Sequence, residues 1–449
     1  MRIEGCLCVI TCSSSSLILD DSLQIIRDSV PFTPPPGWFL ILAGRRAAHC
    51  QQSSALIPSQ LQQAYYQQIA PSQCNTIAII DPGTNNVSSV LSDLATYRST
   101  FGLSPAQITL YNQYGQPLQT SNARAPGYCS VTTDSAQITE QQLDLQMVSA
   151  MCPCCPLVYY AANSDASDDL FQAVQTAVAN ATALNTRVVS ISWGALESQA
   201  KITDQIDAYL FNHTGLVFMA ASGDTGYHVS YPASSQFVTS VGGTALNVDA
   251  YGNRVSEVLW TSGGSPGSGC SAYISRPAWQ PLGACGNKRT VTDISATAGG
   301  VQIYAQGVWI ISGGTSSAAP IISAMYAGGY FGDVNSMSYN SLAGSFYPGG
   351  LNHDRLYDIT TGGSTQGCTA TISSAYLCTA LPGYDGPTGN GAPSVNSSMQ
   401  FPPSPGLRPP SPPAPPSPAE APPRVQSAAI LIPIILSSCL ATALYRMVV

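Results

Sequence analysis

Residues 313–320 read Gly-Gly-Thr-Ser-Ser-Ala-Ala-Pro, and the apolar run that follows them predicts a helix. A serine at the beginning of a helix, here Ser316, can present its hydroxyl to the opening of a site, and small neighbours let a second backbone approach closely. We expect Pro320 in the first helical turn, where its missing N–H costs little. The same pattern also fits a Ser/Thr cap on a buried helix. Ser316 is therefore a candidate nucleophile whose base must come from elsewhere in the chain.

A nucleophilic serine requires a nearby base, and histidine is the usual one. The chain has four histidines, none of which lies in a His-Gly-Thr sequence: His49, His213, His228 and His353. The sequence therefore does not predict a Ser-His-Asp triad.

Glu140 and Asp144 stand four positions apart in a segment with helical spacing, so their carboxyl groups share one helix face. Like charges there oppose ionisation, and one group is expected to keep its proton with a raised pKa. Such a pair could share a proton and accept another from a serine in an acidic medium. Two solvated acids on an exposed helix are the simpler alternative when this segment is considered alone.

Asp224 lies in the sequence Ala-Ser-Gly-Asp-Thr-Gly directly after an apolar strand. A turn of this kind would direct its side chain into the cleft at the strand end. A protonated carboxyl group can donate a hydrogen bond to a developing oxyanion, whereas an ionised one would repel it. The alternative is an aspartate that accepts hydrogen bonds from the backbone of its own turn.

Short apolar strands alternate with amphipathic helices from residue 56 onward. Strands are predicted at 76–80, 157–161, 188–193 and 216–221, and helices at 87–101, 140–151, 168–184 and 202–211. The alternation predicts an α/β fold with a doubly wound, mostly parallel sheet and helices on both faces. Active sites of such sheets gather at the carboxyl ends of strands, where Asp81, Trp193 and Asp224 are expected.

The chain is acidic and poor in charge, with a formal net charge of −8, 16 Lys+Arg and 9% charged residues. It has no basic block, so nucleic acid is not an expected partner. Among the 14 cysteines, no second cluster completes a zinc site with the Cys152–Cys155 group, so we expect disulfides in an oxidising compartment. Four Asn-x-Ser/Thr sequons agree with secretion: Asn86, Asn180, Asn212 and Asn396.

Composition divides the chain into four parts. Residues 1–55 contain a weakly apolar stretch without a clear cleavage pattern, which we interpret as a weak signal segment. Residues 56–397 hold the alternating elements, 398–424 form a proline-rich spacer, and 425–449 form a hydrophobic end. Residues 425–445 carry no charge and are long enough to span a bilayer as a helix. We expect a membrane anchor there, either that helix or a lipid that replaces it.

In combination these motifs resemble the sedolisin family, the serine-carboxyl peptidases, over residues 56–393. The matching motifs occur in family order at 57–61 with Tyr65 and Tyr66, 76–81, 140–144, 190–194, 224, 231–235, 241–244, 293–296 and 314–316. The resemblance implies a subtilisin-like fold, activity in acid and one structural calcium ion. The family also carries a long amino-terminal prodomain, so residues 1–55 are alternatively the remnant of one.

The resemblance also assigns roles to the candidate residues. Ser316 would be the nucleophile, Glu140 the general base and later acid, Asp144 its polariser, and Asp224 the donor to the oxyanion. The implied function is a serine-type endopeptidase, and tripeptidyl-peptidase activity is left open.

The implied calcium site lies near the end of the peptidase region. Its ligands would be carboxylates of Asp358 and Asp385 and carbonyls of Ile359, Leu381 and Gly383, an all-oxygen set that suits calcium. Leu381 stands where the family commonly has glycine. Cys368 and Cys378 lie between the two halves of this site and could form a disulfide that closes it.

Two other functions compete with this prediction. One is a catalytically silent homologue that binds partners at the cell surface, and the other is an ordinary subtilisin-like enzyme that uses a histidine. If the protein is a serine-type endopeptidase, we expect protein or peptide substrates and a monomer. We expect this protein to enter the secretory pathway and to act at the cell surface or outside the cell. There it would be attached to a membrane, and an acidic compartment is a possible place of action.

Overall fold

The computed structural model describes residues 55–66, 71–84, 86–118, 134–200, 202–283, 285–332, 339–368 and 375–394. The predictions for the segment before residue 55, for the proline-rich spacer and for the hydrophobic end fall outside these residues. Within the described part of the chain, no helix has the length and apolar character needed to cross a membrane.

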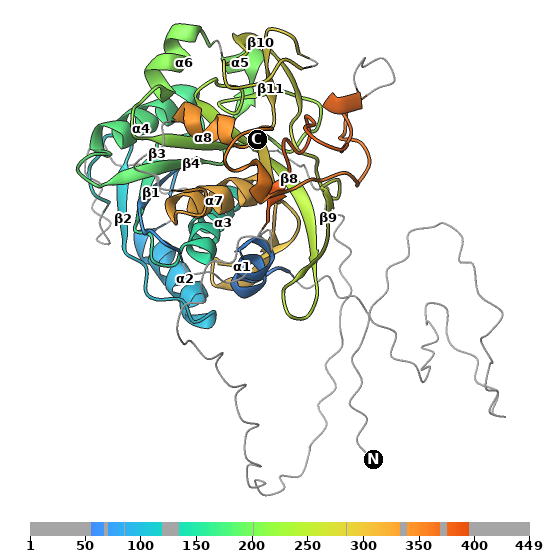
Figure 1. Ribbon diagram of the computed structural model, residues 1–449. Helices are drawn as coiled ribbons and strands as arrows, with labels where there is room; N and C mark the ends of the chain where they lie inside the picture. Colours follow the sequence, from blue (N-terminus) through green and yellow to red (C-terminus); the bar gives the residue numbers. More distant parts are fainter. Residues whose placement is uncertain are drawn as a thin grey trace, which may run out of the picture. The chain divides into compact units, whose positions relative to one another are not determined.

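An eight-stranded sheet forms the centre of the described region (Figure 1). Its strand order is β12-β8-β6-β4-β1-β3-β2, and β9 pairs with β8. All pairs are parallel except β8 with β9. The strands are β1 (Thr76–Pro82), β2 (Ile108–Asn112), β3 (Leu157–Ala162), β4 (Thr186–Ile191), β6 (Val217–Ala221), β8 (Val238–Val248), β9 (Arg254–Leu259) and β12 (Ile294–Thr297). The mostly parallel sheet confirms the predicted fold class.

Helices and short two-stranded sheets surround this sheet. The helices are α1 (Pro58–Tyr66), α2 (Val87–Thr100), α3 (Ser135–Met151), α4 (Ser167–Asn180), α5 (Glu197–Ala200), α6 (Asp204–Phe211), α7 (Thr315–Ala327) and α8 (Tyr339–Ser345), with 3-10 turns at His353–Arg355 and Ala375–Leu377. The short sheets pair β5 (Ala195–Leu196) with β7 (Ser230–Tyr231), β10 (Gly269–Ser275) with β11 (Lys288–Val291), β13 (Val301–Ala305) with β14 (Val308–Ser312), and β15 (Leu356–Tyr357) with β16 (Ala392–Pro393).

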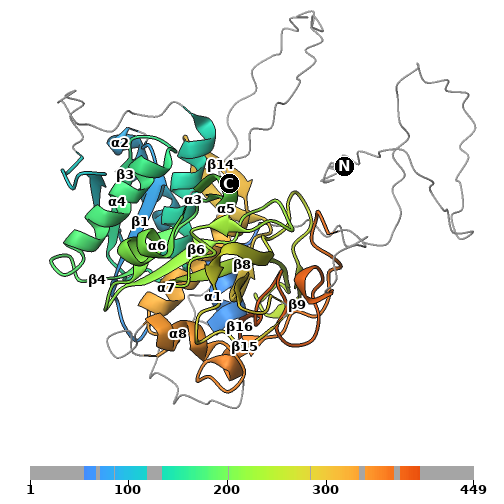
Figure 2. The same cartoon turned by 90° about the horizontal axis from the view of Figure 1, so that it is seen from above.

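The central strand β1 is buried on both faces along its whole length. Ile77 and Ile79 belong to the core formed with α1, α2, α3 and α7, whereas Ala78 and Ile80 belong to the core formed with α4 and α6. Figures 1 and 2 show these two groups of helices on opposite faces of the sheet. Because successive side chains of a strand point to opposite faces, a strand covered on both sides needs a continuous apolar run. That requirement explains the Thr-Ile-Ala-Ile-Ile pattern of the sequence.

The predicted element boundaries differ from the observed ones where local hydrogen bonds begin or end a helix. Helix α3 begins five residues before the predicted start at 140, because the Asp134 side chain caps it by accepting a hydrogen bond from Ala136 N at 2.8 Å. Helix α4 ends at Asn180 rather than at 184. Thr186 N donates to the carbonyl oxygen of Ala181 at 2.8 Å, which closes the chain into a turn before β4.

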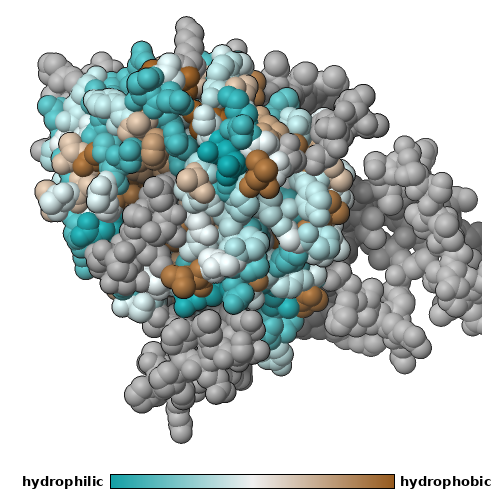
Figure 3. Space-filling model, turned by 45° about the horizontal axis from the view of Figure 1, so that its top comes forward, coloured by the Kyte–Doolittle hydropathy of each residue, from teal (hydrophilic) through white to brown (hydrophobic). Residues whose placement is uncertain are grey.

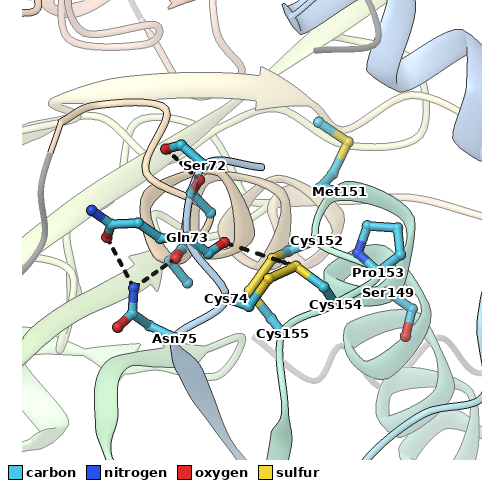
Figure 4. The surroundings of a disulfide bond; sticks show 12 residues. Ser72, Gln73, Cys74, Asn75, Ser149, Met151, Cys152, Pro153, Cys154 and Cys155 are labelled. Atoms are coloured by element: carbon cyan, nitrogen blue, oxygen red, sulfur yellow. Dashed lines mark hydrogen bonds between the residues drawn. A yellow bond between two sulfur atoms is a disulfide. The ribbon is translucent and has the colours of Figure 1, made fainter. Parts of the chain in front are cut away.

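Four disulfides join cysteines of the described region: Cys74–Cys154, Cys152–Cys155, Cys270–Cys285 and Cys368–Cys378. The first two lie side by side just after α3 (Figure 4), where Cys74–Cys154 connects the segment before β1 to the turn that Cys152–Cys155 closes. The Sγ atoms of Cys152 and Cys154 are 3.9 Å apart. These pairings confirm that the cysteine cluster forms disulfides, and they confirm the predicted Cys368–Cys378 bond.

Candidate active site

Three polar residues lie at the carboxyl ends of neighbouring strands. Asp81 lies near the end of β1, Ser192 directly follows β4, and Asp224 lies just beyond β6. These strands are adjacent in the order β6-β4-β1, so their ends meet at one edge of the sheet. Helices α3 and α7 pack against each other on one face of the sheet (Figure 1). They add the remaining candidate groups to this edge.

Ser316 is the second residue of α7. Gly314, just before the helix, has φ +93°, a conformation that favours glycine, and a side chain there would overlap Oδ2 of Asp224. The Ser316 hydroxyl donates to the carbonyl oxygen of Ser192 at 3.4 Å, and it lies close enough to the carboxyl group of Glu140 to lower the pKa of that group. The predicted serine therefore lies beside Glu140, and the Ser192 hydroxyl connects it to Asp144.

The prediction that Pro320 lies in the first turn of α7 is wrong, because the helix begins at Thr315 and Pro320 lies inside it. A proline has no N–H to donate to the carbonyl group four residues earlier, which here is that of Ser316. The Ser316 carbonyl oxygen is instead an acceptor for the Ser192 hydroxyl at 3.3 Å. Pro320 thus frees this carbonyl group to bond with the residue that follows β4.

Glu140 faces the site from α3, and its Oε1 atom is buried without a hydrogen-bond partner among the described residues. Burial raises the pKa of this carboxyl group to about 8. That value already includes the lowering effect of Ser316 and the raising effect of the neighbouring carboxyl groups of Asp81 and Asp224. Glu140 therefore holds a proton more firmly than a solvated glutamate.

Asp144 lies one turn further along α3 and is fully buried. Ser192 Oγ lies 2.9 Å from its Oδ1 atom. Burial, with Asp81 and Glu140 nearby, holds the Asp144 pKa well above its usual range, against the lowering effect of Ser192. Ser192 is the donor to Asp144, and the same hydroxyl lies 3.3 Å from the Ser316 carbonyl oxygen. This chain of groups links the two helices.

Asp81 also belongs to this site, although its place in the sequence predicted only a position at a strand end and no catalytic role. Its carboxyl group is buried, and neither oxygen has a hydrogen-bond partner among the described residues. Burial raises its pKa to about 7. The sequence does show that Asp81 directly follows an apolar run. Burial of a carboxyl group at such a position costs free energy unless the group stays protonated.

Asp224 is oriented by the residue that begins α7. Thr315 donates to its Oδ1 atom twice, from the backbone N–H at 2.8 Å and from the hydroxyl at 2.7 Å. Burial raises the pKa of Asp224, although both hydrogen bonds from Thr315 lower it. The carboxyl group is thus fixed beside the amino end of the helix that carries Ser316.

Histidine is not part of this site in the described region. His228 is exposed, His213 lies 3.0 Å from the carbonyl oxygen of Tyr209, and His353 lies 3.7 Å from the carboxyl group of Asp354. No hydrogen bond among the described residues joins a histidine to Ser316. This arrangement agrees with the absence of a histidine motif from the sequence.

The candidate calcium ligands come together around two aspartates. Asp385 is buried and accepts hydrogen bonds from Leu381 N, Thr388 N and the Thr388 hydroxyl, while Asp358 accepts one from Gly383 N at 2.8 Å. None of the ion pairs among the described residues includes either aspartate. Two neighbouring carboxylates without a cationic side chain paired to them fit a bound calcium ion.

Comparisons with known proteins agree with this architecture. Residues 132–330 match the model of the Subtilase family. Kumamolisin from Bacillus sp. (strain MN-32) is 30% identical over 76% of the chain and 62% of its own length. Sedolisin from Pseudomonas sp. (strain 101) is 30% identical over 75% of the chain and 59% of its own length. The chain therefore spans about three fifths of these curated relatives.

Among solved structures, Pseudomonas sedolisin, described as a serine-carboxyl proteinase complexed with two molecules of pseudo-iodotyrostatin, is similar with a TM-score of 0.61. It is 27% identical, and the match covers 76% of this chain and 95% of that one. The fold and the family match place the chain among proteins with the subtilase architecture. Within that class, these similarities support the sedolisin family.

Proposed function

We propose that this protein is a serine-type endopeptidase that works in acid, with Ser316 as nucleophile. The observation that carries the proposal is the position of Ser316 beside Glu140, with the buried Asp144 connected to it through the Ser192 hydroxyl. The similarity to kumamolisin and to Pseudomonas sedolisin supports the serine-carboxyl class of peptidase.

The proposed reaction uses four groups in sequence. In the reactive form Glu140 and Asp144 hold one proton between them, so Glu140 is ionised. Ser316 Oγ attacks the carbonyl carbon of the peptide bond while its proton passes to Glu140. The resulting oxyanion accepts a hydrogen bond from the protonated carboxyl group of Asp224. Glu140 then transfers the proton to the leaving amine, and water releases the acyl group from Ser316 by the same steps. The requirement that Asp224 carry a proton restricts activity to acid.

A comparison of protein cleavage at about pH 4 and about pH 8 tests this proposal. The parent protein should degrade a denatured protein substrate at the lower pH, and Ser316→Ala should abolish cleavage without changing the thermal unfolding curve. Acid cleavage that survives in Ser316→Ala would refute the nucleophile. A folded parent without cleavage at either pH would instead favour the silent homologue that binds partners.

Cleavage within chains, rather than removal of tripeptides from the amino end, is the finer part of the proposal. A peptide with a blocked amino end distinguishes the two modes, because an exopeptidase of this kind requires the free amine. Cleavage of the blocked peptide supports the endopeptidase, and release of tripeptides from the free peptide alone would overturn it.

We propose one structural calcium ion held by the carboxylates of Asp358 and Asp385 and by the carbonyl groups of Ile359, Leu381 and Gly383. The hydrogen bonds that already join Asp358 to Gly383 and Asp385 to Leu381 support this ligand set. The ion would neutralise the two carboxylates and connect the segments on either side of the Cys368–Cys378 disulfide.

We propose a secreted or cell-surface protein that takes protein or peptide substrates as a monomer. The disulfides support an oxidising compartment. Asn212, just after α6, is the exposed one among the sequon residues that the structure describes, and it is the candidate for glycosylation. Figure 3 shows one face on which hydrophobic residues lie in small groups between hydrophilic ones, which fits a protein without a permanent partner there. Attachment through residues 425–445 stays a prediction, and deletion of the residues after Pro423 tests it by release of active protein from membranes.

A further inference from the structure

The turn that carries Asp224 lies between two other segments of the chain. On one side, Ser265 N donates to the Asp224 carbonyl oxygen and Gly226 N donates to the Ser265 carbonyl oxygen, both at 2.9 Å. On the other side, Tyr227 N donates to the Gln366 carbonyl oxygen at 2.7 Å. The backbone around Asp224 is therefore fixed by residues that the proposed mechanism does not use.

These three segments are packed backbone against backbone. Gly226 has φ +83°, and a side chain there would overlap the carbonyl group of Gln366. A side chain at Gly267 would likewise overlap the carbonyl group of Ser222. With no side chains between the segments, a small shift of either neighbour moves the Asp224 turn directly.

Two buried hydroxyls join the neighbouring segments to each other. Ser265 is 0% exposed and Thr365 is 3% exposed, and their hydroxyl oxygens lie 2.6 Å apart. Thr365 also donates to the Pro266 carbonyl oxygen at 3.0 Å, and Gln366 N donates to the Ser265 hydroxyl at 3.3 Å. Because each hydroxyl has one proton, Ser265 must donate to Thr365. Both hydroxyls are thus satisfied, and each depends on the other.

Thr365 is itself held by a loop that a disulfide closes. We call residues 363–368 and 375–379, with the Cys368–Cys378 bond, the disulfide-closed loop. Thr365 N donates to the Cys378 carbonyl oxygen at 2.6 Å, and Ser268 Oγ donates to the Leu377 carbonyl oxygen at 2.6 Å. The loop is therefore anchored on the same segment that contacts Asp224.

We propose that Thr365 and Ser265 are positioning residues for catalysis, which hold the Asp224 carboxyl group where the oxyanion forms. The inference rests on the proposed function, because it assigns these residues a role in the same reaction. Neither hydroxyl touches the reacting atoms. Their effect passes through the backbone of the Asp224 turn, while Thr315 fixes the side chain from the other direction.

The test measures steady-state kinetics in acid for Thr365→Val, which keeps the side-chain shape and removes the hydroxyl. We expect kcat to fall roughly 10-fold to 100-fold, with KM nearly unchanged, because a small misplacement affects the transition state more than substrate binding. Thr365→Ser should restore most of kcat. Thr379→Val provides the matched control, since Thr379 pairs with Ser364 on the exposed side of the same loop and should leave kcat unchanged.

A double-variant comparison separates positioning from a general loss of stability. In an Asp224→Ala background, Thr365→Val should not lower kcat further, since the group that it positions is gone. An equal loss of kcat in both backgrounds would overturn the inference, as would a folded Thr365→Val with parental kcat. If Thr365→Val does not fold, Ser265→Ala removes the partner hydroxyl instead. It should lower kcat in the parent protein and should not lower kcat further in the Asp224→Ala background. A folded parent without Ser316-dependent cleavage would refute the proposed function itself.

Discussion

Thr315 donates both of its hydrogen bonds to the same oxygen of Asp224, Oδ1, from its backbone N–H at 2.8 Å and from its hydroxyl at 2.7 Å. An oxygen that accepts two hydrogen bonds is a poor position for the acid proton, so the proton of the neutral carboxyl group belongs on Oδ2. Oδ2 lies over Gly314, next to the helix position of Ser316. The pair therefore leaves Oδ2, the oxygen over Gly314, to carry the proton of Asp224.

Substitution of Asp224 should distinguish an oxyanion donor from a structural acceptor. Asp224→Ala should lower kcat roughly 10²-fold to 10³-fold, the usual effect of losing such a donor. Asp224→Asn keeps an oxygen for Thr315 and gains an amide donor that needs no acid, so it should retain more activity and extend activity to higher pH. Steady-state kinetics from about pH 3 to pH 8 measure both effects. An asparagine variant as inactive as the alanine variant would contradict this role.

Substitution of the base should separate chemistry from binding. Glu140→Gln keeps the side-chain shape but cannot take the proton of Ser316, so kcat should fall at least about 10²-fold while KM changes little. Asp144→Asn should have a smaller effect, because Asp144 reaches Ser316 only through Glu140 and Ser192. Active-site titration and kcat on the same preparations provide the measurement. Parental kcat in Glu140→Gln would rule this carboxyl group out as the base.

Stability should fall as the pH rises toward neutral. The folded pKa of Asp81 is about 7, above the ordinary 3.8, so the folded state holds this proton more tightly than the unfolded state. The resulting stability is complete below about pH 4 and is lost as the pH rises through about 7, an effect of up to about 4 kcal/mol. Asp81→Asn should reduce the pH dependence of the free energy of unfolding by the part that Asp81 contributes, as measured by urea unfolding at several pH values. Asp249→Asn, at an exposed aspartate with a lowered pKa, should not flatten it.

Calcium should stabilise the folded protein. An ion bound only by the native state contributes about 2.7 kcal/mol at a concentration 100 times its Kd, so chelation should lower the Tm. Asp358→Asn should reduce this response, because it removes a carboxylate ligand and keeps an oxygen for Gly383 N. Asp354→Asn, at an exposed neighbour, provides the control. A parent whose Tm does not respond to chelation would refute the calcium site.

The Cys74–Cys154 disulfide should contribute strongly to stability. It joins positions 80 residues apart, so in the chain-entropy model its loss costs about 4 kcal/mol. Cys270–Cys285 closes 15 residues and should contribute less, about 3 kcal/mol. Urea unfolding of the two double Cys→Ser variants compares them. The reverse order of stability losses would show that strain or residual structure outweighs loop length.

Much of the fold followed from local patterns. The run from Thr76 to Ile80 predicted a strand buried on both faces, and it forms the central β1. The boundaries of α3 and α4 were less accurate, since they depend on the Asp134 cap and on the turn before Thr186. Such caps are single hydrogen bonds, which a hydrophobic pattern does not record.

The sequence by itself determined which residues of this protein could perform chemistry: Ser316 in its glycine-rich motif, Glu140 and Asp144 on one helix face, and Asp224 after a strand. Only the tertiary structure decided how these groups meet. Asp81 joins them at the strand ends. Ser192 contacts both Asp144 and Ser316, and Ser316 is 124 positions further along the chain. Thr365 contacts Ser265, which is 100 positions earlier, next to the Asp224 turn. The physical reason is that strand order and helix packing set these distances. The raised pKa values come from burial, which exists only in the folded chain.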